Sequence, residues 1–185
     1  LFAGTGAGLA RLGWSVPDLA ASSSALPGPL MICGFFGVVI SLERAVAIGR
    51  LWAYAGPLFA GIGGIAAVAL ATTLAPWLFL LASLVLLAAT IDVMRRQPAM
   101  FTFTLTLGAA AWATGNALWA LGATVHAVVP WWLAFPILTI AGERLELSRF
   151  LPPSPAARRV FAAILATIGA GLLGVWLGAV ASLTL

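Results

Sequence analysis

The sequence predicts an all-α fold, an integral membrane bundle of seven transmembrane helices. Apolar residues make up 63% of the 185 residues and charged residues only 8%, whereas a soluble domain carries about 25% charged residues. The apolar residues also gather in stretches of about 20, the length of helix that crosses a bilayer core of roughly 30 Å. Together, these observations favour membrane-spanning helices over any soluble fold.

Proline, glycine and charged residues divide the chain into its elements. Residues 1–13 are typical of the second half of a membrane helix, so we expect further residues before Leu1. The polar connection WSVPDLAASSSALPG follows, with the composition of an irregular loop. The other six helices are expected at about 29–48, 52–74, 76–93, 100–121, 128–149 and 157–182.

An internal repeat organises the chain as a single transmembrane domain over 1–185. FFGVVISLERAVAIGR at 35–50 resembles FPILTIAGERLELSR at 135–149, and Glu143 follows Glu43 by 143 − 43 = 100 positions. The second and sixth helices cross the membrane in the same direction, so the repeats are parallel, about a common axis along the membrane normal. The predicted arrangement is 3+1+3, with repeat 1 at about 1–74, a connector helix at about 76–94 and repeat 2 at about 100–182.

The basic residues are nine arginines, and the chain contains no lysine. A retinal Schiff base requires a lysine amine, so a rhodopsin is excluded and no retinal is expected. The arginines lie at helix ends and form no soluble basic face, so nucleic acid is not an expected partner. Cytoplasmic connections carry an excess of arginine. This places the N-terminus inside and the C-terminus outside, in a bacterial inner membrane, with Arg11 as the exception.

The strongest site candidates are two Glu-Arg dipeptides, Glu43 with Arg44 and Glu143 with Arg144. Ionisable groups inside a membrane segment are rare and are functional candidates by default. They could be helix anchors whose arginines reach the headgroups. If the two helices meet, Glu43 could instead pair with Arg144 and Glu143 with Arg44, which would form a gate or a proton-linked switch. The two guanidinium groups could also hold a ligand headgroup or a cofactor propionate.

Other charged residues form secondary candidates at helix ends. Asp92 is expected to pair with Arg95 or Arg96, and Glu146 with Arg149 at a spacing of three residues. Both are interpreted as surface pairs.

Several uncharged residues also have expected roles. Asn116 and Thr114 are expected to form hydrogen bonds between helices rather than to contact a solute, and Cys33 to serve packing. Aromatic rings at helix ends are expected to act as anchors at headgroup level; they are Trp14, Trp52, Tyr54, Trp77, Trp131 and Trp132.

No cofactor is predicted. His126 is the only histidine and Cys33 the only cysteine. A haem with two histidine ligands, a copper site with several histidines and a cysteine metal cluster are therefore excluded within one chain. His126 is only a weak candidate for a metal ligand.

The segments ALPGPLMICGFFGVVISLERAVAIGR and LAFPILTIAGERLELSR resemble uncharacterised bacterial polytopic membrane proteins similar to the NnrS family. The resemblance covers about a quarter of the chain and implies a polytopic membrane fold. Members of that family contain haem and copper and are linked to nitrogen-oxide stress. They place histidines at the outer start of the corresponding helix, where this chain has Pro27, Gly28 and Pro29. No ligand is therefore carried over.

Three functions are compatible with these features. The first is a carrier for a small solute, linked to protons, with a cleft that reaches the two glutamates. The second is an accessory, non-catalytic subunit of a larger membrane redox or photosynthetic complex, with an extensive apolar interface. The third is a haem or metal protein. Expected partners are membrane lipid and either further copies of the chain or the subunits of a larger complex. The chain shows no nucleophile–base set and no phosphate loop, which weighs against an enzyme.

Overall fold

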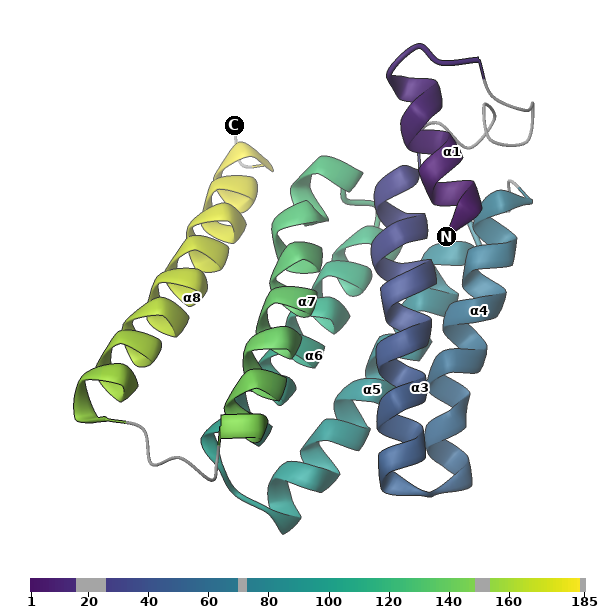
Figure 1. The fold of residues 1–185 in the computed structure, drawn as a ribbon. Coiled ribbons are helices and arrows are strands. Elements are labelled where there is room, and N and C mark those ends of the chain that lie inside the picture. Colours follow the sequence, from purple (N-terminus) through teal and green to yellow (C-terminus); the bar gives the residue numbers. More distant parts are fainter. Residues whose placement is uncertain (16–25, 70–72, 149–153, 184–185) are drawn as a thin grey trace.

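The computed structural model describes residues 1–15, 26–69, 73–148 and 154–183. Within these ranges the regular elements are all helical, which confirms the predicted all-α class. Two of the seven helices begin with a differently wound segment, η1 before α3 and η2 before α4 (Figure 1). The elements are α1 (Phe2–Arg11), η1 (Pro29–Phe36), α3 (Gly37–Ile48), η2 (Leu51–Tyr54), α4 (Ala55–Val68), α5 (Ala75–Arg96), α6 (Met100–Ala120), α7 (Val125–Leu147) and α8 (Pro155–Leu183).

Five of these helices are long and apolar enough to cross a membrane, and the chain is a membrane protein on that basis. They are Pro29–Ile48, Leu51–Val68, α5, α7 and the first 23 residues of α8. Helix α1 has only 10 residues. Helix α6 has 21 residues but carries several threonines. The hydroxyls of Thr104, Thr106 and Thr114 donate to carbonyls four residues earlier, so α6 satisfies these polar groups internally.

The helix from Pro29 to Ile48 has the limits that the sequence predicts. Pro29 lies in its first turn, where a backbone N–H has no partner inside the helix. The N–H that proline lacks therefore costs no helical hydrogen bond. At its other end Gly49 adopts a left-handed conformation, with φ of 66°, and its N–H donates to the carbonyl of Ala45 at 3.0 Å. Glycine adopts this conformation without steric cost.

Helix α7 begins at Val125, three residues before the predicted start. The hydroxyl of Thr124 caps it by accepting from the N–H of Ala127 at 3.4 Å. Pro130 and Pro136 both lie inside the helix. Membrane helices tolerate proline where neighbouring groups satisfy the freed backbone.

Helix α6 is at the centre of the packing. Its most extensive contacts are with α7, followed by those with α5, and α4 packs on the other side of α5. The segment η1 contacts α1, α4 and α7, whereas its continuation α3 packs mainly on α4 and α5. The axis of the second helix is therefore adjacent to α7 at the level of η1.

Helices α3 and α7 run in the same direction, from the upper to the lower end in Figure 1. A parallel repeat requires this, but the 3+1+3 repeat itself stays a prediction.

Helix α8 lies at one edge of the molecule and contacts α7 only sparingly (Figure 1). Large apolar side chains on α8 are exposed, including Ile164, Leu173, Trp176 and Leu177. In a membrane, such side chains face lipid or another protein. The tightly packed part of the fold is therefore the group of helices from η1 to α7.

Candidate functional site

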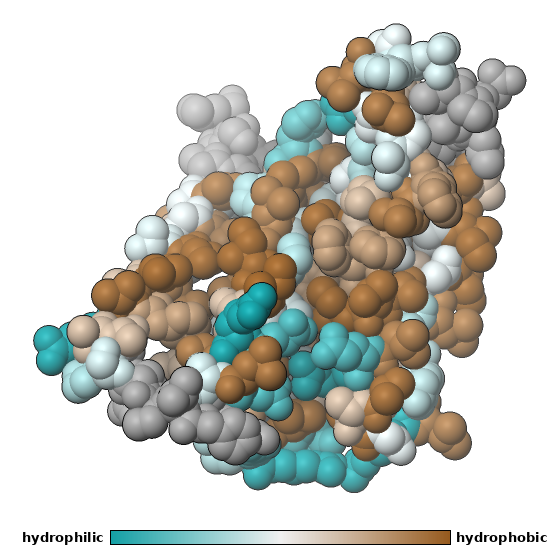
Figure 2. All heavy atoms as spheres, viewed as in Figure 1, coloured by the Kyte–Doolittle hydropathy of each residue, from teal (hydrophilic) through white to brown (hydrophobic). Residues whose placement is uncertain are grey.

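The two Glu-Arg dipeptides lie near the same end of the bundle. Glu43 precedes the last residue of α3 by five positions, and Glu143 precedes the last residue of α7 by four. At 1.5 Å per residue both are roughly 6 to 8 Å from their helix ends. Most of the strongly hydrophilic atoms visible in Figure 2 lie in this lower part of the molecule, while the upper and side faces are largely hydrophobic.

The dipeptides are also close to each other. The Glu143 carboxylate is half-buried, and the charges that act on it include Glu43 and Arg44 from α3 and Glu146 and Arg144 from its own helix. Arg44 is also half-buried, whereas Glu43 and Arg144 are exposed. The fold therefore brings the four predicted residues, with Glu146, into one group between α3 and α7; we call these five residues the charged cluster.

The five residues of the charged cluster form no ion pair with one another. In the described part of the chain, the pair within 4.0 Å is Arg96 with Asp92, at 2.8 Å. The crossed pairing of Glu43 with Arg144 and Glu143 with Arg44 is thus not formed in this structure. The expected pair of Asp92 with Arg96 is confirmed. Arg149, the expected partner of Glu146, lies outside the described residues.

A second group of polar side chains lies deeper, around Asn116 of α6. Asn116 has no exposed surface. Its carbonyl oxygen accepts from the indole N–H of Trp132 at 2.9 Å and from the thiol of Cys33 at 3.3 Å. Its amide nitrogen donates to the carbonyl of Phe79 at 3.0 Å. The expectation that Asn116 joins helices by hydrogen bonds is confirmed.

The thiol of Cys33 extends this group, because it accepts from the indole N–H of Trp112 at 3.4 Å. We call Cys33, Trp112, Asn116 and Trp132 the buried hub. It links η1, α6 and α7 to each other, and Asn116 ties all three to the backbone of α5.

The segment η1 places Cys33 in the hub. It is a π-helix of eight residues, in which backbone bonds span five positions, as in the bond from the N–H of Gly37 to the carbonyl of Ile32. Such segments are rare and often occur at functional sites. Gly34 of η1 faces Gly64 of α4, and a Cβ atom at Gly34 would be in van der Waals contact with the Cα of Gly64 at 3.7 Å.

Aromatic rings enclose the hub. Trp112 stacks on Phe135, with ring centroids 4.7 Å apart and planes at 6°. Gly37 faces this tryptophan so closely that an added Cβ would be 2.5 Å from the ring. Trp112 occupies the space that a side chain at position 37 would need. Only glycine therefore allows the start of α3 to lie this close to the Trp112 ring.

Comparison with known proteins adds one result. The family model described as Domain of unknown function (DUF8744) matches residues 1–185. The chain belongs to the DUF8744 family. No curated protein and no solved structure matches it.

Sequence reasoning missed most of the hub of this DUF8744 protein. Trp132 was expected to be an interfacial anchor, which is wrong, because it is 1% exposed and bonded to Asn116. Thr114 was expected to bond between helices, but its hydroxyl donates to Ala110 of its own helix. One signal was present: an indole N–H in the interior of a membrane helix requires a partner.

The described residues of the DUF8744 chain contain no cluster of three or more histidine, cysteine or acidic residues that could hold a metal ion. His126, the weak metal candidate, is exposed in the first turn of α7.

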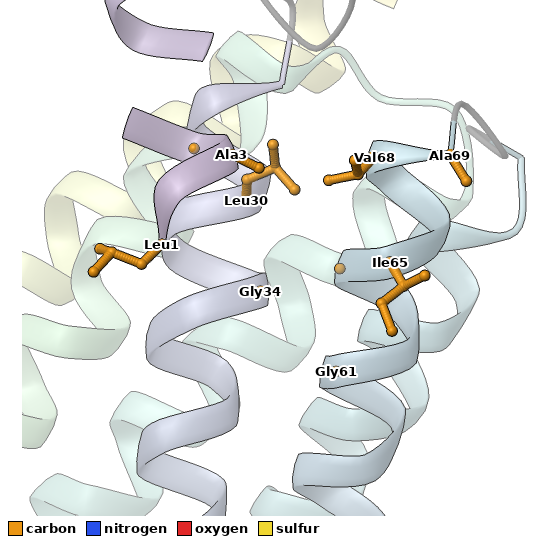
Figure 3. A pocket seen from close by; sticks show the side chains of 10 residues that line it. Leu1, Ala3, Leu30, Gly34, Gly61, Ile65, Val68 and Ala69 are labelled. Carbon is orange, nitrogen blue, oxygen red and sulfur yellow. The ribbon is translucent and has the colours of Figure 1, made fainter. Parts of the chain in front are cut away.

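Open grooves lie on the flanks of the described part of the DUF8744 fold. One, of about 440 Å³, lies between α1, η1 and α4; Leu30 and Val68 face each other across it (Figure 3). Another, of about 260 Å³, lies between α6, α7 and α8 and includes Thr114 and Trp131. A further one, of about 300 Å³, lies between α7 and α8. The first groove is lined entirely by glycine and apolar side chains, so it offers no polar side chain to orient a solute.

Proposed function

We propose that this DUF8744 protein is a membrane carrier that couples the movement of a small solute to proton binding at Glu143. The observation that carries the proposal is the position of Glu143. Its carboxylate is half-buried in a membrane helix, in the field of Glu43 and Arg44 from another helix, and without a closed ion pair. Charged groups at such positions are costly and are retained for function.

A proton on Glu143 changes the interaction between α3 and α7. With both carboxylates charged, Glu43 and Glu143 repel each other, and Arg44 attracts both. Protonation of Glu143 removes the repulsion and weakens its attraction to Arg44. Proton binding therefore alters the electrostatic interaction between the two helices, which is the minimum that a proton-linked carrier requires.

The helices pack more closely around the hub than around the charged cluster. Below η1, α3 turns from α7 and packs mainly on α4 and α5. Above the cluster, the hub fills the space between η1 and α7, because Cys33, Trp112 and Trp132 have at most 1% exposed surface. In this state the hub is closed and the cluster end is the accessible side.

We place the cluster end on the cytoplasmic side of a bacterial inner membrane. Arginine is concentrated there, since Arg44, Arg50, Arg95, Arg96, Arg144 and Arg159 all lie at or near that end of their helices. Arginine-rich ends face the cytoplasm in most membrane proteins.

Transport in reconstituted vesicles tests the proposal. Vesicles that contain the protein and a trapped pH dye are exposed to small carboxylates, amines, amino acids and sugars in turn. At least one class should change the internal pH, and Glu143→Gln should abolish the change. Asp92→Asn is the matched control, because it neutralises a carboxylate of another helix, and it should transport normally. Equal transport by Glu143→Gln, or no pH change with any class, would contradict the proposal.

A second candidate is an accessory subunit of a larger membrane complex. The observation that favours it is α8, which contacts α7 only sparingly and exposes apolar side chains between Val160 and Leu177. Extraction in a mild detergent followed by native electrophoresis distinguishes the two functions. A complex with other subunits favours the accessory function, and a single species that transports in vesicles favours the carrier.

A further inference from the structure

Helix α8 is attached to the rest of the molecule by one narrow face. Its half-buried residues Leu165, Ile168 and Leu172 pack on a small apolar cluster formed by α6 and α7. Residues spaced by three and four positions form a single stripe along a helix. No described side chain between Pro155 and Leu177 is buried, whereas 22% to 44% of the apolar stretch of every other candidate span is buried. Most of the circumference of α8 therefore has no neighbour in the described part of the chain.

The opposite face of α8 consists of small residues with the same spacing. Gly174 follows Leu165 by 174 − 165 = 9 positions. Nine steps of about 100° place it on the other side of the helix. Four small, exposed residues form this face, which we call the small-residue face: Ala163, Thr167, Ala170 and Gly174. A Cβ atom added at Gly174 would meet nothing within 4 Å, so no other part of the described chain occupies that side of α8.

The small-residue face has larger apolar side chains at its borders. A rotation of about 100° per residue defines the two flanks. The exposed residues there are Leu173 and Leu177 on one flank and Ile164 and Val175 on the other. The hydroxyl of Thr167 donates to the carbonyl of Ala163 at 2.9 Å, so its proton is already bonded within α8. The middle of this surface therefore has shorter side chains than its borders and offers no unpaired hydroxyl donor.

These features are those of a contact between membrane helices. Membrane helices associate by van der Waals packing, and their contacts are enriched in glycine, alanine, serine and threonine. Small side chains let two backbones approach closely, and residues spaced by four positions keep them on one line of contact. The small-residue face therefore fits a helix better than it fits any polar ligand.

The surface area of the chain agrees with a missing neighbour. The accessible surface is 10232 Å², whereas a compact folded chain of 19.0 kDa exposes about 8,400 Å². The excess is about 1,800 Å², and each partner in a standard protein interface buries about 800 Å². The chain thus exposes enough additional surface for an interface of that size.

A second copy of the chain is the partner that fits the small-residue face. Two copies inserted in the same orientation present this face at the same depth, and a two-fold axis along the membrane normal brings the same residues together. The closest backbone approach requires small side chains on both helices, and the symmetry provides them on both.

We propose that this DUF8744 protein forms a parallel homodimer through the small-residue face of α8. The opposite face, with Leu165 and Ile168, stays packed on α6 and α7 within each copy. The proposal goes beyond the carrier function and does not depend on it.

Cysteine cross-linking in membranes tests the interface. Single cysteines replace each residue from Ala163 to Gly174 in turn in the full-length chain, and copper phenanthroline oxidises adjacent thiols. A disulfide requires Cα atoms about 4.4–6.8 Å apart. The dimer band should be strong at the four positions of the small-residue face and absent at the three that face α6 and α7. The chain without an added cysteine is the control, because Cys33 has no exposed surface. Equal cross-linking around the helix, or a maximum on the opposite face, would overturn the proposal.

A bulky residue in the small-residue face should separate the two copies. Gly174→Ile should raise the dissociation constant of the dimer by roughly tenfold or more. It should leave the fold of each copy intact, because the added Cβ meets nothing within 4 Å in the described chain. Ala166→Ile is the matched control, since Ala166 is exposed and lies roughly 80° around the helix from Gly174.

Energy transfer between labelled copies in phosphatidylcholine–phosphatidylglycerol vesicles measures the association, and circular dichroism checks the fold of both variants. The normal protein and Ala166→Ile should associate alike. Equal association by Gly174→Ile, or a monomeric normal protein at every protein-to-lipid ratio, would overturn the proposal. A complex of one copy with a different subunit at this face would overturn it as well.

Discussion

The buried hub and the charged cluster share helix α7, but their polar side chains differ in how they are bonded. Trp132 and Glu143 are 143 − 132 = 11 residues apart on α7, roughly 16 Å along its axis. In the hub, the indole, thiol and amide donors are all bonded to groups of other helices. In the cluster, five charged side chains lie near one another and form no ion pair among themselves.

This difference indicates which region holds the fold and which can change. Without water, an unsatisfied polar group costs several kcal/mol, so the bonds of the hub specify one arrangement of η1, α5, α6 and α7. The cluster lies nearer the helix ends, where a charge costs less. None of the hydrogen bonds of the hub involves a residue of the cluster. Mutations should therefore affect stability at the hub and proton-dependent behaviour at the cluster.

Trp112→Ala should have the largest effect. Trp112 has no exposed surface, stacks on Phe135 and donates to Cys33. Truncation of a buried tryptophan leaves a cavity and should lower the free energy of unfolding by about 3–5 kcal/mol. Thermal unfolding in detergent measures the loss. Trp77→Ala, at a 49% exposed tryptophan of α5, should be nearly neutral, and equal losses would remove the distinction between core and periphery.

Asn116→Leu should follow. The substitution keeps a side chain of similar size but leaves the indole N–H of Trp132 buried without a partner. An orphaned buried donor costs about 1–3 kcal/mol. The same thermal assay applies, with Thr114→Val as the control on the same helix, because Thr114 bonds only to its own helix. If both variants lose the same stability, the hydrogen bonds of the hub do not hold the helices together.

Glu143→Gln should change stability by less than about 1 kcal/mol, because no closed ion pair is lost. The unfolding temperature of the normal protein should depend on pH in part through Glu143, and the variant should lose that part. A large loss of stability at every pH would assign the charged cluster to the structural part of the molecule.

Asp92→Asn should have the smallest effect on stability. Its partner Arg96 is 54% exposed, and the two residues are four positions apart on one helix. Such pairs contribute about 0.3–0.5 kcal/mol. Unfolding at low and high salt should show a small loss that disappears when salt screens the pair. A loss above about 1 kcal/mol would show that this end of α5 contributes more than a surface pair.

Much of the fold was predictable because its signals are local. Pro29 and Gly49 delimit one helix in the sequence as in the structure. The offset of 100 residues between Glu43 and Glu143 correctly indicated carboxylates near the same end of helices that run in the same direction.

The hub was not predictable because its contacts join distant residues. Cys33 and Asn116 are 83 positions apart, and nothing near either one indicates the other. The predicted helix start at about residue 128 put Trp132 near a helix end, and so at the interface instead of in the core. The π-helix leaves the apolar pattern of η1 unchanged, so periodicity gives no sign of it. Whether the crossed ion pairs close depends on side-chain distances that the sequence does not contain.

The most direct test of the account is an infrared measurement of proton binding in lipid membranes. As the pH is lowered, a protonated carboxylic acid should show a carbonyl stretching band that an ionised carboxylate lacks. We expect this band in the normal protein and in Asp92→Asn, and its loss or marked reduction in Glu143→Gln. A band of the same size and pH dependence in Glu143→Gln would contradict the assignment of Glu143 as the proton-binding group.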